Sequence, residues 1–541
     1  MASVENNVVY GGPVSESITS NAKSFGEFFL QKFKEAEDKV ILIDGVTDEE
    51  FTARQLRENI IKMAYCLENL GIGEGDVVSI CSENRVEFII TLFATFCLNA
   101  TIAPLNVTYS ERELDHAINL SKPKVIFSSN FAFDKIVKIF QKNKFVKNIV
   151  AYDKNSKYRN ISSFWELLND SQFSFKAEYY PKPADLNESV LLILCSSGTT
   201  GMPKGVQLSQ KNILYTFDQK SSDSILEMLT LLSVIPWFHS YGCVSLILIT
   251  VFAMRLVFLP RFEEKAFLRA IEKHSVQLAF MVPPLMVFLA KHPMIDNYDL
   301  SSLVGLMSGA APLSKDVEDA VKERIGISII RQGYGLSEST LSLLAQNDSH
   351  CKPGSVGALV TGHWAKVIDT ETGEILGSNK RGELCFKGPC IMKGYIGDAD
   401  STQTIIKDGW LHTGDIGYYD ENLEFFIVDR IKELIKYKAF QVPPAEIEAL
   451  LLSNPKIKDA AVVGLPDDEC GELPFAFVVK QPGVILTENE VIDFVKSRTS
   501  AAKRLRGGVQ FIDEIPKNPS GKILRRYLRD MLKNRSVKSK L

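Results

Sequence analysis

Hydrophobic and polar positions along the chain alternate between a helical and an extended spacing. In residues 54–70 apolar side chains recur every three or four positions, as in an amphipathic helix, and residues 85–99 repeat that spacing. Short apolar runs at 77–81, 101–104, 190–195 and 425–428 are typical of buried strands. This alternation predicts an α/β fold in which mainly parallel sheets are flanked by helices.

Length and composition narrow the possible classes of protein. A chain of 541 residues that is 45% hydrophobic and 24% charged predicts a globular protein of two to four domains. The net charge of −4 gives no reason to expect a nucleic-acid partner. The longest mainly apolar run, 243–254, is shorter than the roughly 18 residues that span a bilayer. We therefore expect no transmembrane segment, and we expect a monomer.

The nine cysteines are scattered and include no C-x-x-C pair. This spacing predicts neither a zinc site nor a disulfide framework. It fits a reducing compartment.

The most informative segment, residues 196–205, follows the apolar run 190–195 and has the sequence SSGTTGMPKG. Its glycines let the backbone approach a ligand closely, its hydroxyls and N–H groups can surround phosphate oxygens, and Lys204 adds a positive charge. It is not the common phosphate loop, because Pro203 replaces the second glycine of that motif and no Ser or Thr follows Lys204. We expect it to bind the pyrophosphate end of a nucleoside triphosphate.

Two further segments suit the rest of a nucleotide. The small-residue turn at 308–312 leaves room for a flat ring such as adenine. In the segment 332–338, QGYGLSE, Tyr334 can stack on adenine, Ser337 can donate a hydrogen bond to the α-phosphate, and Glu338 can hold Mg²⁺.

The pattern changes near residues 429–432, DRIK. The strand-like run 425–428 precedes this point, and a lysine-rich stretch with a fresh αβ pattern follows it. Pro443 and Pro444 precede a helical stretch at 445–452, as is common at helix starts. We expect a domain boundary here.

Together these motifs resemble the adenylate-forming superfamily, which includes acyl-CoA synthetases, 4-coumarate–CoA ligases, beetle luciferases and adenylation domains of peptide synthetases. The resemblance covers nearly the whole chain. The opening segment 7–11, NVVYG, and the ending Ser539-Lys540-Leu541 look most like beetle luciferases and luciferase-like fatty acyl-CoA synthetases. The resemblance implies three parts. They are a large N-terminal part (1–429) with several subdomains including a β-subdomain, a hinge (430–432), and a small, mobile α+β lid (433–541).

The resemblance also assigns roles residue by residue. Lys522 is implied to drive adenylate formation, and Lys436 to enter the site for thioester formation when the lid rotates. His239, Tyr241 and Leu341 are implied to shape the acyl pocket, and Glu338 to hold Mg²⁺. The implied nucleotide-binding residues are Ser196, Ser197, Gly198, Thr199, Thr200, Gly201, Lys204, Gly309, Ala310, Ala311, Gln332, Gly333, Tyr334, Gly335, Ser337, Asp415, Arg430 and Gln441.

Asp415, in the segment 409–415 (GWLHTGD), and Arg430 are implied to contact the ribose. The chemistry implied for Lys522 is physically reasonable. A carboxylate must attack the phosphorus of an anionic nucleotide, and an ammonium between them offsets the repulsion by roughly 3 to 4 kcal/mol.

Two departures from the family pattern bear on the reaction, one on the choice of acid and one on the step with coenzyme A. Leu341 stands where luminous luciferases typically have serine, which favours an alkyl chain over a heteroaromatic ring. Ala439 replaces the usual glycine near the passage for the pantetheine arm, from which we expect a slower step with coenzyme A.

We therefore predict an ATP- and Mg²⁺-dependent fatty acyl-CoA synthetase that uses coenzyme A. The C-terminal Ser-Lys-Leu predicts a peroxisomal location and an import receptor as partner. A luciferase and a 4-coumarate–CoA ligase remain alternatives. The presence of Glu338, Asp415, Lys436 and Lys522 together argues against a non-catalytic binding protein.

Overall fold

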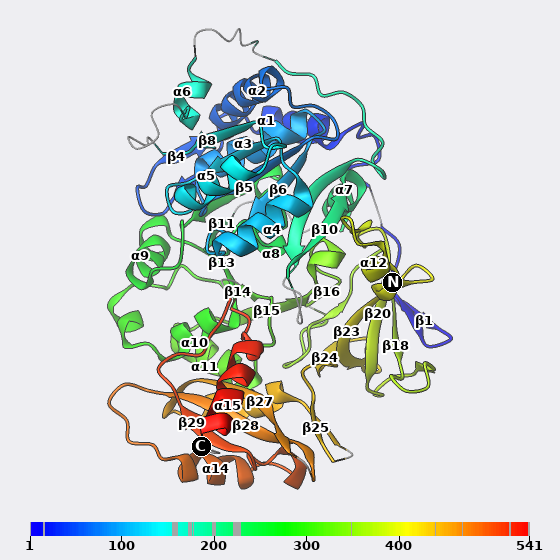
Figure 1. The fold of residues 1–541 in the computed structure, drawn as a ribbon, viewed down its shortest axis with the longest axis vertical. Helices are drawn as coiled ribbons and strands as arrows, with labels where there is room; N and C mark the ends of the chain where they lie inside the picture. The colour runs from blue at the N-terminus through cyan, green and yellow to red at the C-terminus, as the bar shows by residue number, and fades with distance from the viewer. Residues whose placement is uncertain are drawn as a thin grey trace.

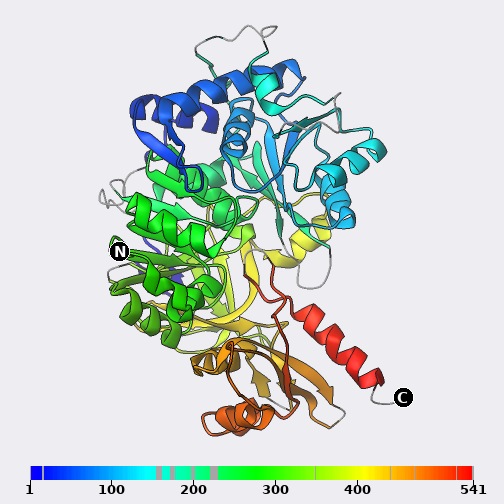
Figure 2. The same cartoon turned by 90° about the vertical axis from the view of Figure 1, so that its left-hand side faces the viewer.

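The computed structural model describes residues 2–14, 17–153, 161–170, 176, 178–196, 202–219, 229–347, 349–438, 440–467, 469–518 and 521–538. Four sheets and their helices make up this part of the chain. Figures 1 and 2 show a small C-terminal unit, orange and red, at one end of the long axis, with the larger N-terminal part beyond it.

The first sheet has seven strands in the order β21-β10-β9-β6-β5-β7-β8. Its central strands are parallel, whereas β10 and β21 join antiparallel at one edge. The strands are β5 (Val77–Cys81), β6 (Thr101–Leu105), β7 (Val125–Ser128), β8 (Asn148–Ala151), β9 (Val190–Ser196), β10 (Lys204–Ser209) and β21 (Gly394–Tyr395). The helices nearby in sequence are α1 (Phe25–Ala36), α2 (Ala53–Asn69), α3 (Val86–Cys97), α4 (Glu111–Ser121), α5 (Phe133–Lys142), α6 (Phe164–Leu168) and α7 (Gln210–Asp218).

The elements expected from periodicity agree closely with these bounds. The helix expected at 54–70 is α2, and the strand expected at 77–81 is β5. Thr52 and Gln55 form a capping box that fixes the start of α2.

The second sheet has nine strands in the order β17-β16-β15-β14-β13-β11-β12-β3-β4, with a parallel centre from β15 to β3. The strands are β3 (Val40–Asp44), β4 (Glu50–Thr52), β11 (Thr230–Ser233), β12 (Arg255–Phe258), β13 (Leu278–Met281), β14 (Gly305–Ser308), β15 (Ile329–Tyr334), β16 (Leu344–Ala345) and β17 (Ala358–Leu359). Its helices are α8 (Ser240–Val251), α9 (Glu264–His274), α10 (Pro283–Lys291) and α11 (Lys315–Ile325).

The helix α8 explains the long apolar run noted in the sequence. It is apolar on all sides and packs in one core cluster with β5 and β9 of the first sheet and β12 of the second. A helix of this kind is buried within the protein. None of the helices in the described ranges is both long and apolar enough to cross a membrane.

The third sheet is the antiparallel β-subdomain implied by the resemblance. It has eight strands, with the path β1-β2-β18-β20-β23-β22 and with β19 and β24 at its sides. The strands are β1 (Ser3–Glu5), β2 (Val8–Tyr10), β18 (Trp364–Ile368), β19 (Ile375–Leu376), β20 (Gly382–Lys387), β22 (Ile406–Lys407), β23 (Trp410–Tyr419) and β24 (Phe425–Arg430), and helix α12 (Ala399–Ile405) lies beside them.

The C-terminal unit begins beyond β24 and has a sheet of its own. Its five strands are β25 (Ile435–Tyr437), β26 (Phe440–Val442), β27 (Ile457–Asp467), β28 (Gly471–Lys480) and β29 (Gly508–Phe511). Its helices are α13 (Pro444–Ser453), α14 (Glu488–Lys496) and α15 (Arg525–Lys538). The predicted α/β fold with a β-subdomain and a small α+β unit is confirmed.

The C-terminal unit touches the rest of the protein through polar contacts. The Lys291 ammonium of α10 donates to the carbonyls of Leu452 and Ile457 at 2.8 and 3.0 Å, near the end of α13. Figures 1 and 2 show the segment before α15, in red, reaching from this unit into the larger part. This segment carries Lys522.

One buried ion pair lies within the C-terminal unit, and we expect its loss to be costly. Arg525 donates to both carboxylate oxygens of Glu448 at 2.7 Å, and the Val462 N–H also binds that carboxylate. Arg525→Met leaves a buried, unpaired carboxylate and should lower the free energy of unfolding by about 3 to 5 kcal/mol, measured by urea denaturation. Lys456→Met breaks the exposed Lys456–Glu490 pair and should cost less than about 1 kcal/mol. Equal losses in the two variants would mean that the buried pair contributes no more than the exposed one.

Candidate active site

Several of the predicted site residues lie at the carboxyl ends of the parallel strands of the nine-stranded sheet. The segment with Gly309, Ala310 and Ala311 follows β14, and the segment 332–338 runs from the end of β15 into a single 3₁₀ turn, Ser337–Ser339. His239 immediately precedes α8. Ligands of open α/β sheets bind outside the carboxyl ends of strands, so the topology and the motifs indicate the same place.

Three side chains form a hydrogen-bonded group at the predicted ribose position. The Tyr334 hydroxyl donates to Asp415 Oδ2 at 2.7 Å, and Arg430 Nε lies 3.1 Å from Asp415 Oδ1. Asp415 and Arg430 are opposite each other in the register of β23 and β24. Burial and the neighbouring Asp415 raise the pKa of Tyr334, so this hydroxyl stays a hydrogen-bond donor.

Lys522 lies between β29 and α15. The Asn518 N–H donates to the Lys522 carbonyl, and the Lys522 N–H donates to the Asn518 side-chain oxygen at 2.8 Å. Gly521 has a φ of +79°, and a Cβ there would lie 3.1 Å from the ring of Pro284 in α10. A residue with a side chain is therefore unfavourable beside Lys522.

The charges around Lys522 connect the predicted catalytic and nucleotide-binding groups. Burial and the charge of Arg430 lower the pKa of the Lys522 ammonium, whereas Asp415 and Glu338 oppose that shift. Lys522 is therefore within electrostatic reach of both the predicted ribose carboxylate and the predicted metal carboxylate.

His239 is electrostatically coupled to Lys522. Burial lowers the pKa of His239 to about 4, and the charge of Lys522 adds to the shift, so the ring is neutral at physiological pH. Its Nε2 is buried and has no hydrogen-bond partner within the described residues. Buried polar atoms normally have a hydrogen-bond partner, so an unpaired one calls for an explanation. A ligand oxygen could be the partner of Nε2.

Glu338 is positioned to hold a cation. The Tyr395 hydroxyl donates to Glu338 Oε1 at 2.8 Å, and burial raises the pKa of that hydroxyl. The remaining lone pairs of the carboxylate can bind a metal. One carboxylate next to phosphate oxygens fits Mg²⁺, which is usually held by one or two carboxylates and the substrate phosphates.

Lys204 is held by residues that sequence reasoning missed. Its ammonium binds the Ser401 hydroxyl, lies 3.2 Å from Asp398 Oδ2, and is 5.0 Å from the centre of the Tyr395 ring. Asp398 and Ser401 lie nearly 200 residues from Lys204 along the chain. Tyr395 thus contacts both the predicted phosphate lysine and the predicted metal ligand.

Three further predicted residues, Gln332, Gly333 and Gly335, make contacts that support the fold around the site. The Gln332 amide donates to Glu318 at 3.2 Å, so this side chain joins β15 to α11. A Cβ at Gly335 would lie 1.7 Å from the Leu341 carbonyl oxygen, so only glycine fits there. At Gly333 a Cβ would lie 3.4 Å from the Ser342 hydroxyl oxygen, which is ordinary contact.

The residues implied to shape the acyl pocket lie close to the same loops. The Tyr241 hydroxyl donates to the Met307 carbonyl at 3.2 Å, and the Tyr241 ring faces Gly309. Leu341 is half-buried against the core that contains α8. Ser337 lies beside α8, with its hydroxyl oxygen 3.3 Å from that of Ser240.

Lys436 and Gln441 are apart from this group. They face each other across the β25–β26 hairpin, and both are exposed. The Lys436 N–H donates to Glu472 at 2.8 Å. The structure therefore has Lys522 in the site and Lys436 in solvent.

Several predicted positions lie outside the described residues. They are Ser197, Gly198, Thr199, Thr200, Gly201, Ala439 and the terminal Ser539-Lys540-Leu541. Ser196 is described, at the end of β9, where it pairs with Lys204 of β10.

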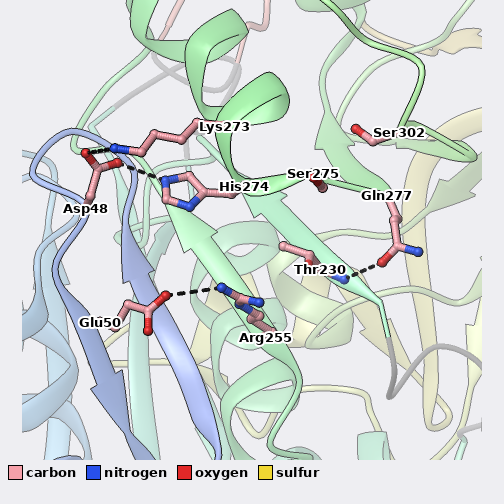
Figure 3. Close-up of a pocket in the computed structure, with 9 residues that line it drawn as sticks. All are labelled: Asp48, Glu50, Thr230, Arg255, Lys273, His274, Ser275, Gln277 and Ser302. Atoms are coloured by element: carbon pink, nitrogen blue, oxygen red, sulfur yellow. Dashed lines mark hydrogen bonds and ion pairs between the residues drawn. The ribbon is translucent and has the colours of Figure 1, made fainter.

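A cavity of about 710 Å³ lies at the amino ends of the parallel strands of the nine-stranded sheet, opposite the ends that carry the site (Figure 3). Thr230 and Arg255, the first residues of β11 and β12, line it. Its charged side chains are paired with one another, Lys273 with Asp48 at 2.6 Å and Arg255 with Glu50 at 3.1 Å. It takes no part in the site described above.

Comparison with known proteins agrees with this geometry. Residues 29–396 match the AMP-binding enzyme family, and residues 446–522 match the AMP-binding enzyme C-terminal domain. The chain is 40% identical to luciferin 4-monooxygenase of Photinus pyralis over 500 residues, 91% of each chain. It is 39% identical to a probable 4-coumarate–CoA ligase of Dictyostelium discoideum over 530 residues, 94% of this chain and 95% of that one.

Solved structures give the same assignment of fold. An anthranilate CoA ligase in complex with anthranoyl-AMP has a TM-score of 0.88 at 21% identity, covering 95% of this chain and 98% of that chain. ATP-bound MatB from Rhodopseudomonas palustris has a TM-score of 0.83 at 25% identity, covering 94% and 98%. The chain belongs to the AMP-binding enzyme family and has the fold of the adenylate-forming superfamily.

Proposed function

We propose that this protein is an ATP-dependent fatty acyl-CoA synthetase. The observation that carries the proposal is the half-buried Lys522 side chain, whose charge interacts with Glu338, Asp415 and His239, a histidine whose Nε2 has no partner among the described residues. An adenylating enzyme needs a cation where the acid and the nucleotide meet, and the predicted metal, ribose and acyl groups surround this one.

The proposed reaction has two steps. In the first, a carboxylate oxygen of the acid forms a bond to the α-phosphorus of ATP, and pyrophosphate leaves. Lys522 offsets the charge of the two anions, Glu338 holds Mg²⁺, and Asp415 and Arg430 bind the ribose. In the second, the sulfur of coenzyme A attacks the acyl carbon, AMP leaves, and the thiol proton passes to solvent.

A fatty acid is the proposed substrate because Leu341 supplies an apolar side chain near the acyl site. Each buried CH₂ of an alkyl chain contributes about 0.8 kcal/mol. The alternatives are the reactions named for the relatives, oxidation of luciferin and ligation of 4-coumarate. The proposed location is the peroxisome, on the basis of the terminal Ser-Lys-Leu.

A substrate panel tests this choice. We expect pyrophosphate release with ATP and Mg²⁺ to be fastest for acids between hexanoate and oleate, to be stimulated by coenzyme A, and to exceed release with 4-coumarate. Leu341→Ser should lower kcat/KM for the preferred fatty acid by about tenfold or more and increase light emission with luciferin. Leu341→Met keeps an apolar side chain and serves as the control. Strong light from the unmodified protein would favour the luciferase alternative.

The two lysines should separate the two steps. Lys522→Ala should lower the rate of adenylate formation about 10²- to 10³-fold and leave the reaction of supplied acyl-adenylate with coenzyme A largely intact. Lys436→Ala should leave adenylate formation largely intact, because Lys436 lies exposed, away from the adenylation site. It should slow the reaction of supplied acyl-adenylate with coenzyme A, the step in which the resemblance implies a role for Lys436. Single-turnover assays of each step provide the measurement, and equal loss of both steps in each variant would refute the assignment.

The pH dependence of adenylation should report Lys522. The side chain must be charged, and its pKa is lowered from the usual 10.5 by burial and by Arg430. The rate should therefore fall, as pH rises, at a lower pH than an ordinary lysine would give. Lys522→Arg should be slower but keep its rate to higher pH, since guanidinium stays charged. Lys436→Arg should leave the profile unchanged, and an unmoved profile in Lys522→Arg would exclude Lys522 as the titrating group.

A further inference from the structure

Three side chains with metal-binding atoms meet in the β-subdomain, outside the roles assigned above. Glu383 and Cys385 come from β20, and His412 comes from β23. Their ligand atoms all lie within 4.8 Å of one another. The sequence predicted no zinc site because these residues form no C-x-x-C pair and His412 lies 27 positions from Cys385.

The strands themselves bring these residues together. Residues two apart on a strand point to the same face, so Glu383 and Cys385 share one side of β20. His412 is directly opposite Cys385 in the register of β20 and β23. A register shift between Glu383 and Cys385 pairs Glu383 with Ile416 and makes room beside Gly414. The group therefore rests on two paired strands with a local irregularity at Gly414.

The distances fit a small tetrahedral ion. Cys385 Sγ lies 3.5 Å from His412 Nδ1, and Glu383 Oε2 lies 3.1 Å from the same nitrogen. Zinc bonds of about 2.3 Å to sulfur and about 2.0 to 2.2 Å to nitrogen and oxygen, at tetrahedral angles, separate such ligand atoms by about 3.4 to 3.6 Å. The third pair, Cys385 Sγ and the Glu383 carboxylate, lies within 4.8 Å and would close to about 3.6 Å around an ion.

The ligand set has a chemical preference. A thiolate and an imidazole select zinc-like cations over Mg²⁺ and Ca²⁺, which take oxygen ligands. Glu383 Oε1 already accepts the Gly414 N–H at 2.9 Å, which orients the carboxylate and leaves Oε2 for a metal. Three protein ligands leave a fourth position for water.

We propose that Glu383, Cys385 and His412 bind a zinc-class divalent cation, distinct from the Mg²⁺ expected at Glu338. On binding, the Cys385 thiol releases its proton to solvent as the sulfur–metal bond forms. Glu383 accepts the Gly414 N–H, His412 lies two residues before Gly414 on β23, and Asp415 follows Gly414. The cation therefore fixes the part of β23 that carries the ribose carboxylate, and it takes no part in the chemical step.

Cobalt provides a direct spectroscopic test in the full-length protein, reduced with a phosphine and free of nucleotide. We expect one equivalent of Co²⁺ to give a thiolate-to-cobalt charge-transfer band and tetrahedral visible bands, both lost on adding Zn²⁺. Cys351→Ser is the matched control, because Cys351 is exposed and follows His350, an alternative thiol–imidazole pair. This control should keep the bands, and Cys385→Ser should lose them.

Two further variants keep the test decisive if Cys385→Ser does not fold. His412→Gln should bind Co²⁺ at least tenfold more weakly, and Glu338→Gln should bind it as the unmodified protein does. Zinc should raise the thermal unfolding midpoint of the unmodified protein and of Cys351→Ser, but not that of His412→Gln. Bands that survive in Cys385→Ser, an affinity of His412→Gln for Co²⁺ equal to that of the unmodified protein, or bands that vanish in Cys351→Ser would overturn the proposal.

Discussion

A half-buried lysine ammonium in the active site, that of Lys522, is the constraint on which the rest of the structure depends. Lys522 belongs to the C-terminal unit but is surrounded by groups of the larger part, so burying its charge requires both. Asp415 and Glu338 supply the opposing charge, and Gly521 lets the loop lie against Pro284. Desolvating an ammonium is costly unless such partners are present. The chemistry of the site therefore depends on the position of the C-terminal unit.

The contacts that hold this unit in place are suited to being broken. Lys291 donates to two backbone carbonyls of the C-terminal unit, and Asp429 accepts the Ala445 N–H across the chain segment that joins the two parts. Polar contacts of this kind exchange readily with water, unlike a large apolar interface. Such contacts suit the movement of this unit that the family resemblance implies.

The local spacing of apolar residues was sufficient to predict helices and strands, but not the contacts between side chains of the site. Periodicity predicted α2 and β5, because each buries one regular set of side chains. The hydrogen bond from Tyr334 to Asp415 and the contacts of Lys204 with Asp398 and Ser401 join residues 81 to 197 positions apart. Such pairings depend on how sheets pack, which no local spacing encodes. The Cys385–His412 pair was missed for the same reason.

The two lysines lie at different places in the C-terminal unit, Lys436 on β25 and Lys522 between β29 and α15. Near Lys436, β25 pairs with β28 at Gly471, whereas β29, which leads toward Lys522, ends opposite Val478. These two points are seven residues apart along β28, about 23 Å. In the structure the C-terminal unit presents Lys522 to the site and leaves Lys436 exposed. This is the arrangement that the proposed adenylation step needs.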